Sequence, residues 1–236
     1  MKLNGNRLET FKKIELFSSL GRDELLQVTE KITFKSFRRN EVILYEEDSN
    51  EFMYIILEGE VKVMQSTEEG KEIILAIHRA GDFFGELSLI DGKTSPASVI
   101  ATKHSSMAII AKNAFFSLIF NQQNVLRKLL LILCSRFRES LGTIQMLNFN
   151  NALQRIKMLF IMLAEKYGKE EAGLKVLNIK LTHQDIAEMA GMTRETVTRV
   201  LDKLQKDGEI GVLKDKLIAL KQSFFENDSI LRASGS

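Results

Sequence analysis

The hydrophobic pattern changes along the chain, and this change limits the folds that the chain can adopt. Between about Phe34 and Ile110 of the 236 residues, β-branched and aromatic residues occur in short runs such as EVILYEE and KEIILAIH, which turn signals such as DG separate. From about Ala114 the apolar residues instead recur at helical spacing. From about Asn150 the chain predicts further helices and, near its end, a β hairpin with the sequence EIGVLKDKLIALK. The pattern indicates an α+β protein.

Short strands at this spacing are typical of an antiparallel sandwich or barrel. The segment before them, FKKIELFSSLGRDELLQVTEKI, has a helical pattern, and we expect it to cap the β unit. We therefore expect three parts: a β domain over residues 1–113, a long helix over residues 114–148 and a mainly helical domain that ends in the hairpin over residues 149–236. The second junction rests on the change of pattern and on nearby asparagines.

The predicted long helix carries two apolar faces. One is a seam of about three heptads, which steps by four and three residues and includes one polar residue, Ser140. Its apolar members are Leu126, Leu130, Leu133, Phe137, Ile144 and Leu147. A second row, with Leu129, Ile132 and the Phe115–Ile119 cluster, lies off the seam. We expect the second row to contact the β domain and the seam to pair with a twin helix in a homodimer; the alternative is one helix buried in a monomer.

The composition excludes several classes of protein. The net charge of +2 is too small to indicate a partner, so any nucleic-acid surface must be local. The lone Cys134, which we expect to be a buried thiol, excludes an intrachain disulfide and an iron–sulfur cluster held by the cysteines of one subunit. No apolar run approaches the ~20 residues of a membrane span, and the N-terminus lacks an apolar signal core. These features predict a cytoplasmic protein without a membrane partner.

The segment LTHQDIAEMAGMTRETVTRVLDKLQKDGEI predicts two short helices across a tight turn. Thr182 can cap the first helix together with Asp185, and Gly191 can end it. Thr193 can cap the second helix, whose inner face consists of Val197, Val200, Leu201 and Leu204. Ala187 and Gly191 are small where we expect the two helices to approach each other. This arrangement is a helix-turn-helix, and the hairpin that follows would be its wing.

Helical geometry then fixes the outer face of the second helix. Four residues project from its first turns, Arg194, Glu195, Thr198 and Arg199, and Asp202 and Lys203 follow them. The N-terminal residues of a recognition helix reach base edges in the major groove of DNA. Arginine pairs with guanine and glutamate accepts from cytosine, so these side chains suit steps that contain G·C pairs. The alternative for such a charged run is a solvated helix face with local ion pairs.

These motifs give the chain a resemblance to the cAMP receptor protein/FNR family of transcription regulators over essentially its whole length. EGEVKV and GDFFGELSLIDG resemble the family's effector-binding β-roll, a jelly roll of the cyclic-nucleotide-binding type, and MTRETVTRVLDKLQKDGEI resembles its winged helix-turn-helix. The long helix resembles the family's dimerisation helix. The resemblance implies that Arg194, Glu195 and Arg199 read GTGA-type half-sites and that Thr182 and Thr196 contact phosphates. Two subunits would place their recognition helices about 34 Å apart, on an inverted repeat.

The effector pocket implied by the resemblance departs from the family at one place. In nucleotide-binding members, a Gly-Glu-Leu turn precedes an Arg-Ser/Thr-Ala triplet whose arginine neutralises the phosphate. This chain has the turn, but a serine stands where the arginine would be. A charge-assisted hydrogen bond contributes about 1.5–3 kcal/mol, so its loss predicts that cAMP binds at least about tenfold to hundredfold more weakly. The positions implied for the pocket are Gly85, Glu86 and Leu87 in the turn, Ser95, Pro96 and Ala97 in the triplet, and Ser140 and Leu141 on the long helix.

The residue types present also limit the other effectors. An FNR-like iron–sulfur cluster needs cysteines that the chain lacks. Haem needs an axial ligand, for which His78, His104 and Cys134 are the nominal candidates, although a lone histidine on a strand is more often a surface residue. A small effector other than cAMP, a haem that senses nitric oxide or carbon monoxide, and no effector at all therefore stay open.

The sequence thus predicts a homodimeric, sequence-specific DNA-binding regulator with the β domain as sensor and RNA polymerase as a further partner. A constitutive DNA-binding protein with a vestigial sensor domain is the alternative. An enzyme on a similar barrel, such as a cupin-like metal oxygenase, would need a His-x-His cluster with a carboxylate. His78, His104 and His183 are isolated in the sequence, so it predicts neither an enzyme nor a metal site.

Overall fold

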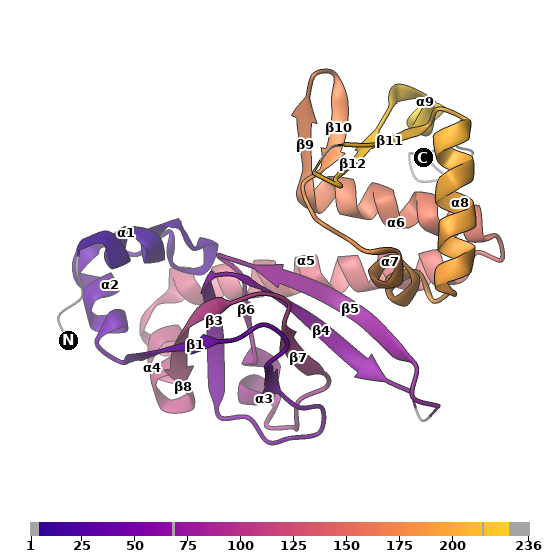
Figure 1. The fold of residues 1–236 in the computed structure, drawn as a ribbon. Coiled ribbons are helices and arrows are strands. Elements are labelled where there is room, and N and C mark those ends of the chain that lie inside the picture. Colours follow the sequence, from indigo (N-terminus) through magenta and orange to yellow (C-terminus); the bar gives the residue numbers. More distant parts are fainter. Residues whose placement is uncertain (1–4, 68, 214, 227–236) are drawn as a thin grey trace. The chain divides into compact units, whose positions relative to one another are not determined.

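A computed structural model describes residues 5–67, 69–213 and 215–226 of the chain, which forms two compact units, residues 1–135 and 136–236 (Figure 1). The division falls inside one helix, α5 (Gln123–Leu147). The first unit is a β-roll and the second a helix-turn-helix with β hairpins, which confirms the predicted fold class. The three-part division into residues 1–113, 114–148 and 149–236 stays a prediction. None of the described helices is long and apolar enough to cross a membrane.

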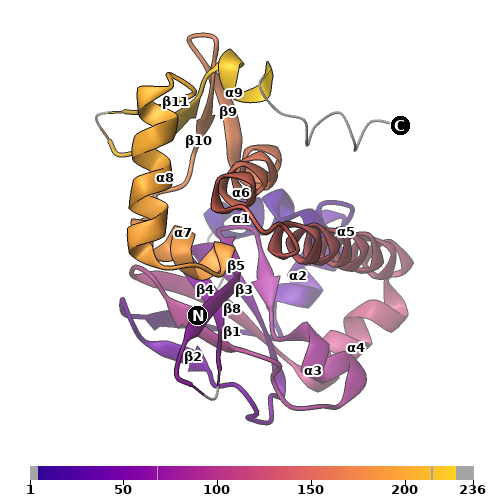
Figure 2. The same cartoon turned by 90° about the vertical axis from the view of Figure 1, so that its right-hand side faces the viewer.

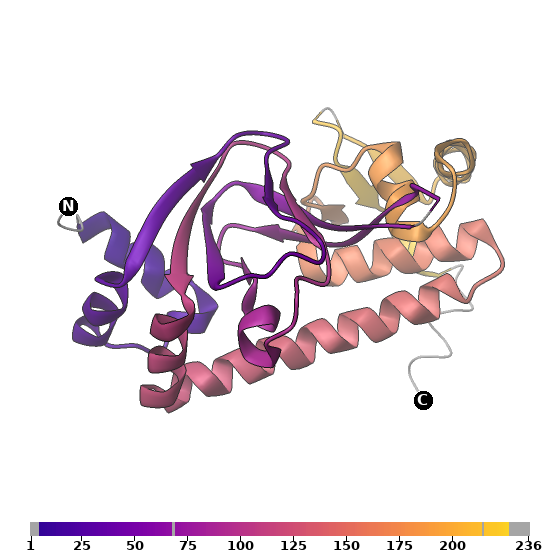
Figure 3. The same cartoon turned by 90° about the horizontal axis from the view of Figure 1, so that it is seen from below.

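Two four-stranded antiparallel sheets form the first unit (Figure 3). One has the order β1-β8-β3-β6 and consists of β1 (Ile32–Phe37), β8 (Ser105–Ala111), β3 (Phe52–Glu58) and β6 (Phe83–Phe84). The other has the order β2-β7-β4-β5 and consists of β2 (Val42–Leu44), β7 (Ser98–Ala101), β4 (Glu60–Ser66) and β5 (Glu72–Arg79). The short helix α3 (Glu86–Asp91) lies between β6 and β7 in the chain.

Strand β3 contributes to two apolar cores, which explains why FMYIILE is almost continuously hydrophobic. Successive side chains of a strand point to opposite faces of its sheet. Tyr54 and Ile56 belong to the core between the two sheets, whereas Met53 and Ile55 belong to a core that the helices share. The strand is thus covered on both sides, a situation in which alternation of polar and apolar residues disappears.

Three short N-terminal helices complete the core that contains Met53 and Ile55, and they cap the β unit as the sequence predicts. They are α1 (Gly5–Lys13), the 3₁₀ helix η1 (Glu15–Phe17) and α2 (Arg22–Thr29). Phe11 and Phe17 are fully buried, with ring centroids 5.8 Å apart. Their partners include Phe115 and Leu129 from the helices that follow the β-roll, so the off-seam row of the predicted long helix does contact its own β domain.

The structure corrects the expectation of one continuous helix over residues 114–148. The segment forms α4 (Lys112–Asn121) and α5, which are separated at Gln122 by non-helical backbone (φ −128°, ψ 83°). The Asn121 side chain donates to the Ser117 carbonyl oxygen (2.7 Å), a local hydrogen bond of the kind that competes with the helical ladder. The break lets α4 and α5 turn separately toward the apolar core.

The seam on α5 is largely exposed in the single chain. The exposed fractions are 54% for Leu130, 65% for Phe137 and 58% for Ile144, and Leu126 and Leu147 are exposed as well. Leu133 differs, because it is partly buried against the core of the first unit. Cys134 is also exposed, so the expectation of a buried thiol is wrong. It lies four residues after Leu130, on the same exposed side of the helix.

The second unit combines helices with a small sheet (Figure 2). Its helices are α6 (Ala152–Tyr167), α7 (His183–Ala190), α8 (Arg194–Lys206) and α9 (Gln222–Glu226). Its strands have the order β11-β12-β10-β9, namely β11 (Ile210–Val212), β12 (Ile218–Leu220), β10 (Leu174–Leu177) and β9 (Gly168–Glu171). The hairpin β11–β12 confirms the predicted wing. The hairpin β9–β10 is an addition, and its turn residues Ala172 and Gly173 both have positive φ.

Candidate DNA-binding surface and effector region

The first helix of the helix-turn-helix, α7, begins with the capping box that the sequence predicts. The Thr182 hydroxyl oxygen accepts from the Asp185 backbone N–H (3.1 Å), and Asp185 Oδ2 accepts from the Thr182 N–H (2.8 Å). At the other end, Gly191 has the left-handed conformation (φ 63°) of a helix C-cap. Both boundaries of α7 are therefore set by local chemistry.

Gly191 is small for a reason other than the predicted approach of α7 to α8. A Cβ atom there would lie 3.2 Å from Cδ2 of Leu147 on α5. Arg155 of α6 contacts the same turn: its Nε donates to the Phe149 carbonyl (2.6 Å), and its Nη1 lies 3.5 Å from the carbonyl oxygens of Ala190 and Gly191. The turn of the helix-turn-helix is thus attached to the end of α5 and the start of α6.

The second helix, α8, has the predicted inner and outer faces. Its N-cap Thr193 accepts from the Thr196 N–H (3.3 Å). The inner face is buried and consists of Val197, Val200, Leu201 and Leu204, as the sequence predicts. The outer face lines an open hollow formed by Arg194, Glu195, Thr198, Arg199, Asp202, Lys203, Lys206 and Asp207. Because the inner face holds α8 in the fold, the outer face can contact a partner without any change in the packing of the helix.

The hollow brings together five of the eight predicted DNA contacts, and the other three do not line it. Arg194, Glu195, Thr198, Arg199 and Lys203 line it. Thr193 and Thr196 lie at the start of α8, with their hydroxyl oxygens 3.1 Å apart, and Thr182 caps α7. Three further residues complete the lining, namely Asp202, Lys206 and Asp207. Asp202 belongs to the outer face that the sequence predicts. Helical periodicity could also have found Lys206, because it follows Thr198 by two steps of four residues.

In the effector region, the turn at Gly85 has a purely structural explanation. Gly85 adopts φ 85°, and a Cβ atom there would lie 2.6 Å from the Phe52 carbonyl oxygen. The Asn50 side chain donates to the carbonyl oxygens of Gly85 (2.9 Å) and Phe52 (2.7 Å), so the turn is fastened to the start of β3. Glu86 is buried, whereas Leu87 is exposed.

Ser95 stands where the family has its arginine, and its hydroxyl, its N–H and its carbonyl all form hydrogen bonds within the protein. Its hydroxyl donates to the Ala97 carbonyl (2.8 Å), its N–H donates to the Asp48 carbonyl (2.8 Å), and its own carbonyl accepts from the Glu47 N–H (2.9 Å). Both Ser95 and Ala97 are buried. Pro96 is exposed and lacks an N–H, and its carbonyl accepts from Gln65 Nε2 (2.7 Å). The triplet is a closed turn that has no cation to offer a phosphate.

The remaining pocket positions lie on α5 in the second unit. Ser140 is exposed and donates its hydroxyl to the Arg136 carbonyl (3.0 Å), four residues earlier. Leu141 is exposed too. Their neighbours on the helix are the exposed seam residues Phe137 and Ile144.

The interior of the β-roll is aromatic and apolar near the proposed pocket. The rings of Tyr54 and Phe84 stack with centroids 5.0 Å apart and an interplanar angle of 5°. Burial raises the pKa of the Tyr54 hydroxyl above its usual value of 10.0, so this group stays neutral. An interior of this kind favours an uncharged ligand or uncharged side chains over a phosphate without a counter-charge.

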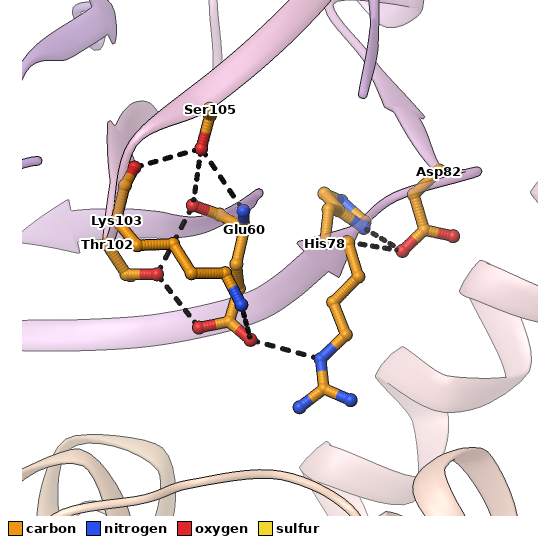
Figure 4. A network of polar contacts seen from close by, with 7 residues as sticks. Glu60, His78, Asp82, Thr102, Lys103 and Ser105 are labelled. Atoms are coloured by element: carbon orange, nitrogen blue, oxygen red, sulfur yellow. Dashed lines mark hydrogen bonds and ion pairs between the residues drawn. The ribbon is translucent and has the colours of Figure 1, made fainter. Parts of the chain in front are cut away.

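The nominal haem and metal ligands are dispersed. His78, which we expected as a surface residue of a strand, is buried, and its Nδ1 lies 3.8 Å from Asp82 Oδ2 (Figure 4). His104 and Cys134 are exposed. Among the described residues, no three histidine, cysteine, aspartate or glutamate side chains gather in a way that could hold a metal ion.

The polar contacts beside His78 have a structural role. Glu60 of β4 accepts from Arg79 Nε (3.1 Å) and from the Thr102 hydroxyl (2.8 Å), and Lys103 Nζ lies 3.7 Å away (Figure 4). The Ser105 hydroxyl accepts from the Glu60 N–H (3.1 Å). These bonds fasten the turn before β8 to the start of β4.

Comparisons with known proteins agree with this geometry. The family models that match are the cyclic nucleotide-binding domain, over residues 34–122, and the Crp-like helix-turn-helix domain, over residues 154–222. The chain is 32% identical to the cAMP-activated global transcriptional regulator CRP of Escherichia coli, over 69% of this chain and 78% of that protein. It is 30% identical to the global nitrogen regulator of a Nostoc species, over 79% of this chain and 85% of that protein.

A solved structure of a CRP/FNR family transcriptional regulator from Thermus thermophilus is similar as well. It has 28% sequence identity and a TM-score of 0.62, and the match covers 82% of this chain and 97% of that one. Relatives named for cAMP and for nitrogen regulation thus share one architecture with this chain, so the architecture alone does not identify an effector.

Proposed function

This chain belongs to the cAMP receptor protein/FNR family of transcription regulators, which are not enzymes, and from this we propose that it acts in the cytoplasm as a homodimer on an inverted-repeat operator. The observation that carries the proposal is the exposed outer face of α8. This helix belongs to a helix-turn-helix in which Thr182 and Gly191 cap α7 and Thr193 caps the start of α8. Each α8 would enter the major groove of one half-site, and RNA polymerase would be a further partner.

The charges on α8 suit mixed base recognition better than simple phosphate binding. The hollow has four basic and three acidic side chains, so its net positive charge is small. Arg194 and Arg199 would pair with guanines, and Glu195 would accept from a cytosine amino group, as GTGA-like half-sites require. Thr182, Thr193, Thr196 and Lys203 would contact the phosphates on either side.

We expect Arg199→Ala and Glu195→Ala each to reduce the free energy of DNA binding by about 1–3 kcal/mol at the base pair that the side chain contacts, because each variant removes a direct base contact. Selection of bound duplexes from a random pool should show a relaxed preference at one position in each half-site. The affinity of the unaltered protein should fall as salt rises, since phosphate contacts release counterions. An unchanged preference in both variants would contradict the assignment of these residues.

The exposed seam on α5 supports the homodimer. Its apolar side chains extend over a helix of 25 residues, and burial of such a row against a twin helix would remove them from water. Ser140 and Leu141 would then lie at or beside the dimer interface, where a ligand bound to the β-roll could alter the pairing of the helices.

The closed turn at Ser95 supports an effector other than cAMP. We expect calorimetry with micromolar cAMP or cGMP to show no binding, because a buried phosphate would lack its counter-charge. The control is a family member that keeps the arginine, measured under the same conditions. A clear isotherm with this chain would contradict the proposal for Ser95.

Two alternatives remain for the sensor. The interior packing of the β-roll equally suits a constitutive regulator with a vestigial sensor domain. Haem-based sensing of nitric oxide or carbon monoxide would have to use His78, His104 or Cys134. A Soret absorption band in protein produced with added haem would support that alternative.

A further inference from the structure

One hydrogen bond joins the two helices of the helix-turn-helix through side chains alone. His183, the first residue of α7, has its Nδ1 2.8 Å from the hydroxyl oxygen of Thr198 on α8. Thr198 lies on the outer face of α8, in the hollow that the proposed function assigns to DNA. The same hydroxyl lies 3.0 Å from the Arg194 carbonyl oxygen, one turn earlier on α8.

These two contacts use the hydroxyl hydrogen of Thr198 whichever tautomer His183 adopts. If the hydrogen points to the Arg194 carbonyl, the imidazole donates from Nδ1 to the hydroxyl oxygen. If it points to Nδ1, the imidazole accepts it. In both arrangements no hydrogen is left for an outside partner. Thr198 therefore presents to solvent only a methyl group and a hydrogen-bond acceptor.

His183 also fixes the side-chain rotamer of Thr198. A threonine in a helix divides between two rotamers, because its hydroxyl can reach carbonyls in the preceding turn. A second partner on a neighbouring helix stabilises only the rotamer that reaches both. The position of the methyl group relative to the groove is then set before DNA binds.

We propose that His183 is a positioning residue for base recognition, which holds Thr198 as an acceptor-and-methyl group on the DNA-facing side of α8. This inference rests on the proposed function. In the major groove the matching base edges are those with an amino group, cytosine N4 or adenine N6, and the thymine methyl group beside them. The base pair that faces Thr198 is selected for these groups, and a base that offers only acceptors there is disfavoured.

The test compares His183→Leu with His183→Asn in the full-length protein. The asparagine amide nitrogen lies as many bonds from the backbone as Nδ1 and can donate, whereas leucine cannot. Random-duplex selection should show that His183→Leu loses about 2- to 10-fold of preference at one base pair per half-site, as Thr198→Val does, and that His183→Asn retains it. Adding His183→Leu to Thr198→Val should change the preference no further.

A second measurement does not depend on DNA. The three-bond couplings that report χ1 of Thr198 should indicate one rotamer in the unaltered protein and in His183→Asn, and averaged rotamers in His183→Leu. Equal loss of affinity for every sequence in His183→Leu, or a single rotamer in that variant, would overturn the inference. If the unaltered protein selects no sequence at all while the couplings behave as expected, it is the proposed function that fails.

Discussion

Lys157→Met is expected to destabilise the second unit by about 3–5 kcal/mol, because it leaves a buried carboxylate without its counter-charge. Lys157 of α6 lies 2.5 Å from Glu209 Oε2, and the two side chains are only 6% and 10% exposed. Among the described residues Oε2 has no partner besides this ammonium group, so the lysine charge is its compensation. The ammonium group also lies 5.3 Å from the centre of the Phe224 ring, a cation–π contact that the variant loses.

The measurement is native-state hydrogen exchange in peptides from α6 and β11, which reports the free energy of opening of this unit within the whole chain. The control is Lys166→Met, which breaks the exposed pair of Lys166 with Glu139 (2.6 Å) and should cost less than about 1 kcal/mol. Replacing both Lys157 and Glu209 with methionine should recover most of the stability, because two apolar side chains need no compensation. A single Lys157→Met variant as stable as the control would show that the pair contributes little.

Phe137→Glu is expected to abolish the homodimer and to weaken binding to an inverted repeat by about 10²–10⁴-fold, which is the gain that linking two binding modules provides. Phe137 is the most exposed of the apolar seam residues on α5. In a dimer a carboxylate there would be buried against the apolar seam of the twin helix, at a high desolvation cost. In the monomer it would stay in water and leave each recognition helix intact.

Sedimentation equilibrium gives the oligomeric state, and fluorescence anisotropy with a full operator and a half-operator gives the two affinities. Ser135→Glu is the matched control, because it adds the same charge at an exposed position about 200° around the helix from Phe137. The control should remain dimeric. A Phe137→Glu variant that is still a dimer, or a monomeric variant with full affinity for the inverted repeat, would contradict the proposed pairing through α5.

Much of the architecture could be predicted because its signals are local. The capping residues Thr182 and Thr193 and the C-cap Gly191 each act within one turn of their own helix, so a short stretch of sequence contains everything needed to place α7 and α8. The strands of the β-roll were likewise recognisable from their composition and turns. The break at Gln122 was missed, because helical spacing of apolar residues continues on both sides of it.

Residues whose role depends on distant partners could not be predicted in the same way. Cys134 follows a run of leucines and isoleucine, yet α5 turns it to the exposed side, and only the packing of that helix decides this. The sequence identifies Ser95 as a departure from the family, but two of the three hydrogen bonds that close its turn involve Glu47 and Asp48, about which the motif says nothing.

The sequence by itself determined the succession of a β domain, a helical segment and a helix-turn-helix with outward-facing charges, since each follows from the periodicity or the chemistry of neighbouring residues, and its resemblance to the family pointed to the missing arginine. Only the tertiary structure decided that Lys157 meets Glu209 in a buried pair and that His183 holds Thr198. Such contacts join separate elements, and their formation depends on how the chain packs. A linear pattern carries no record of that packing.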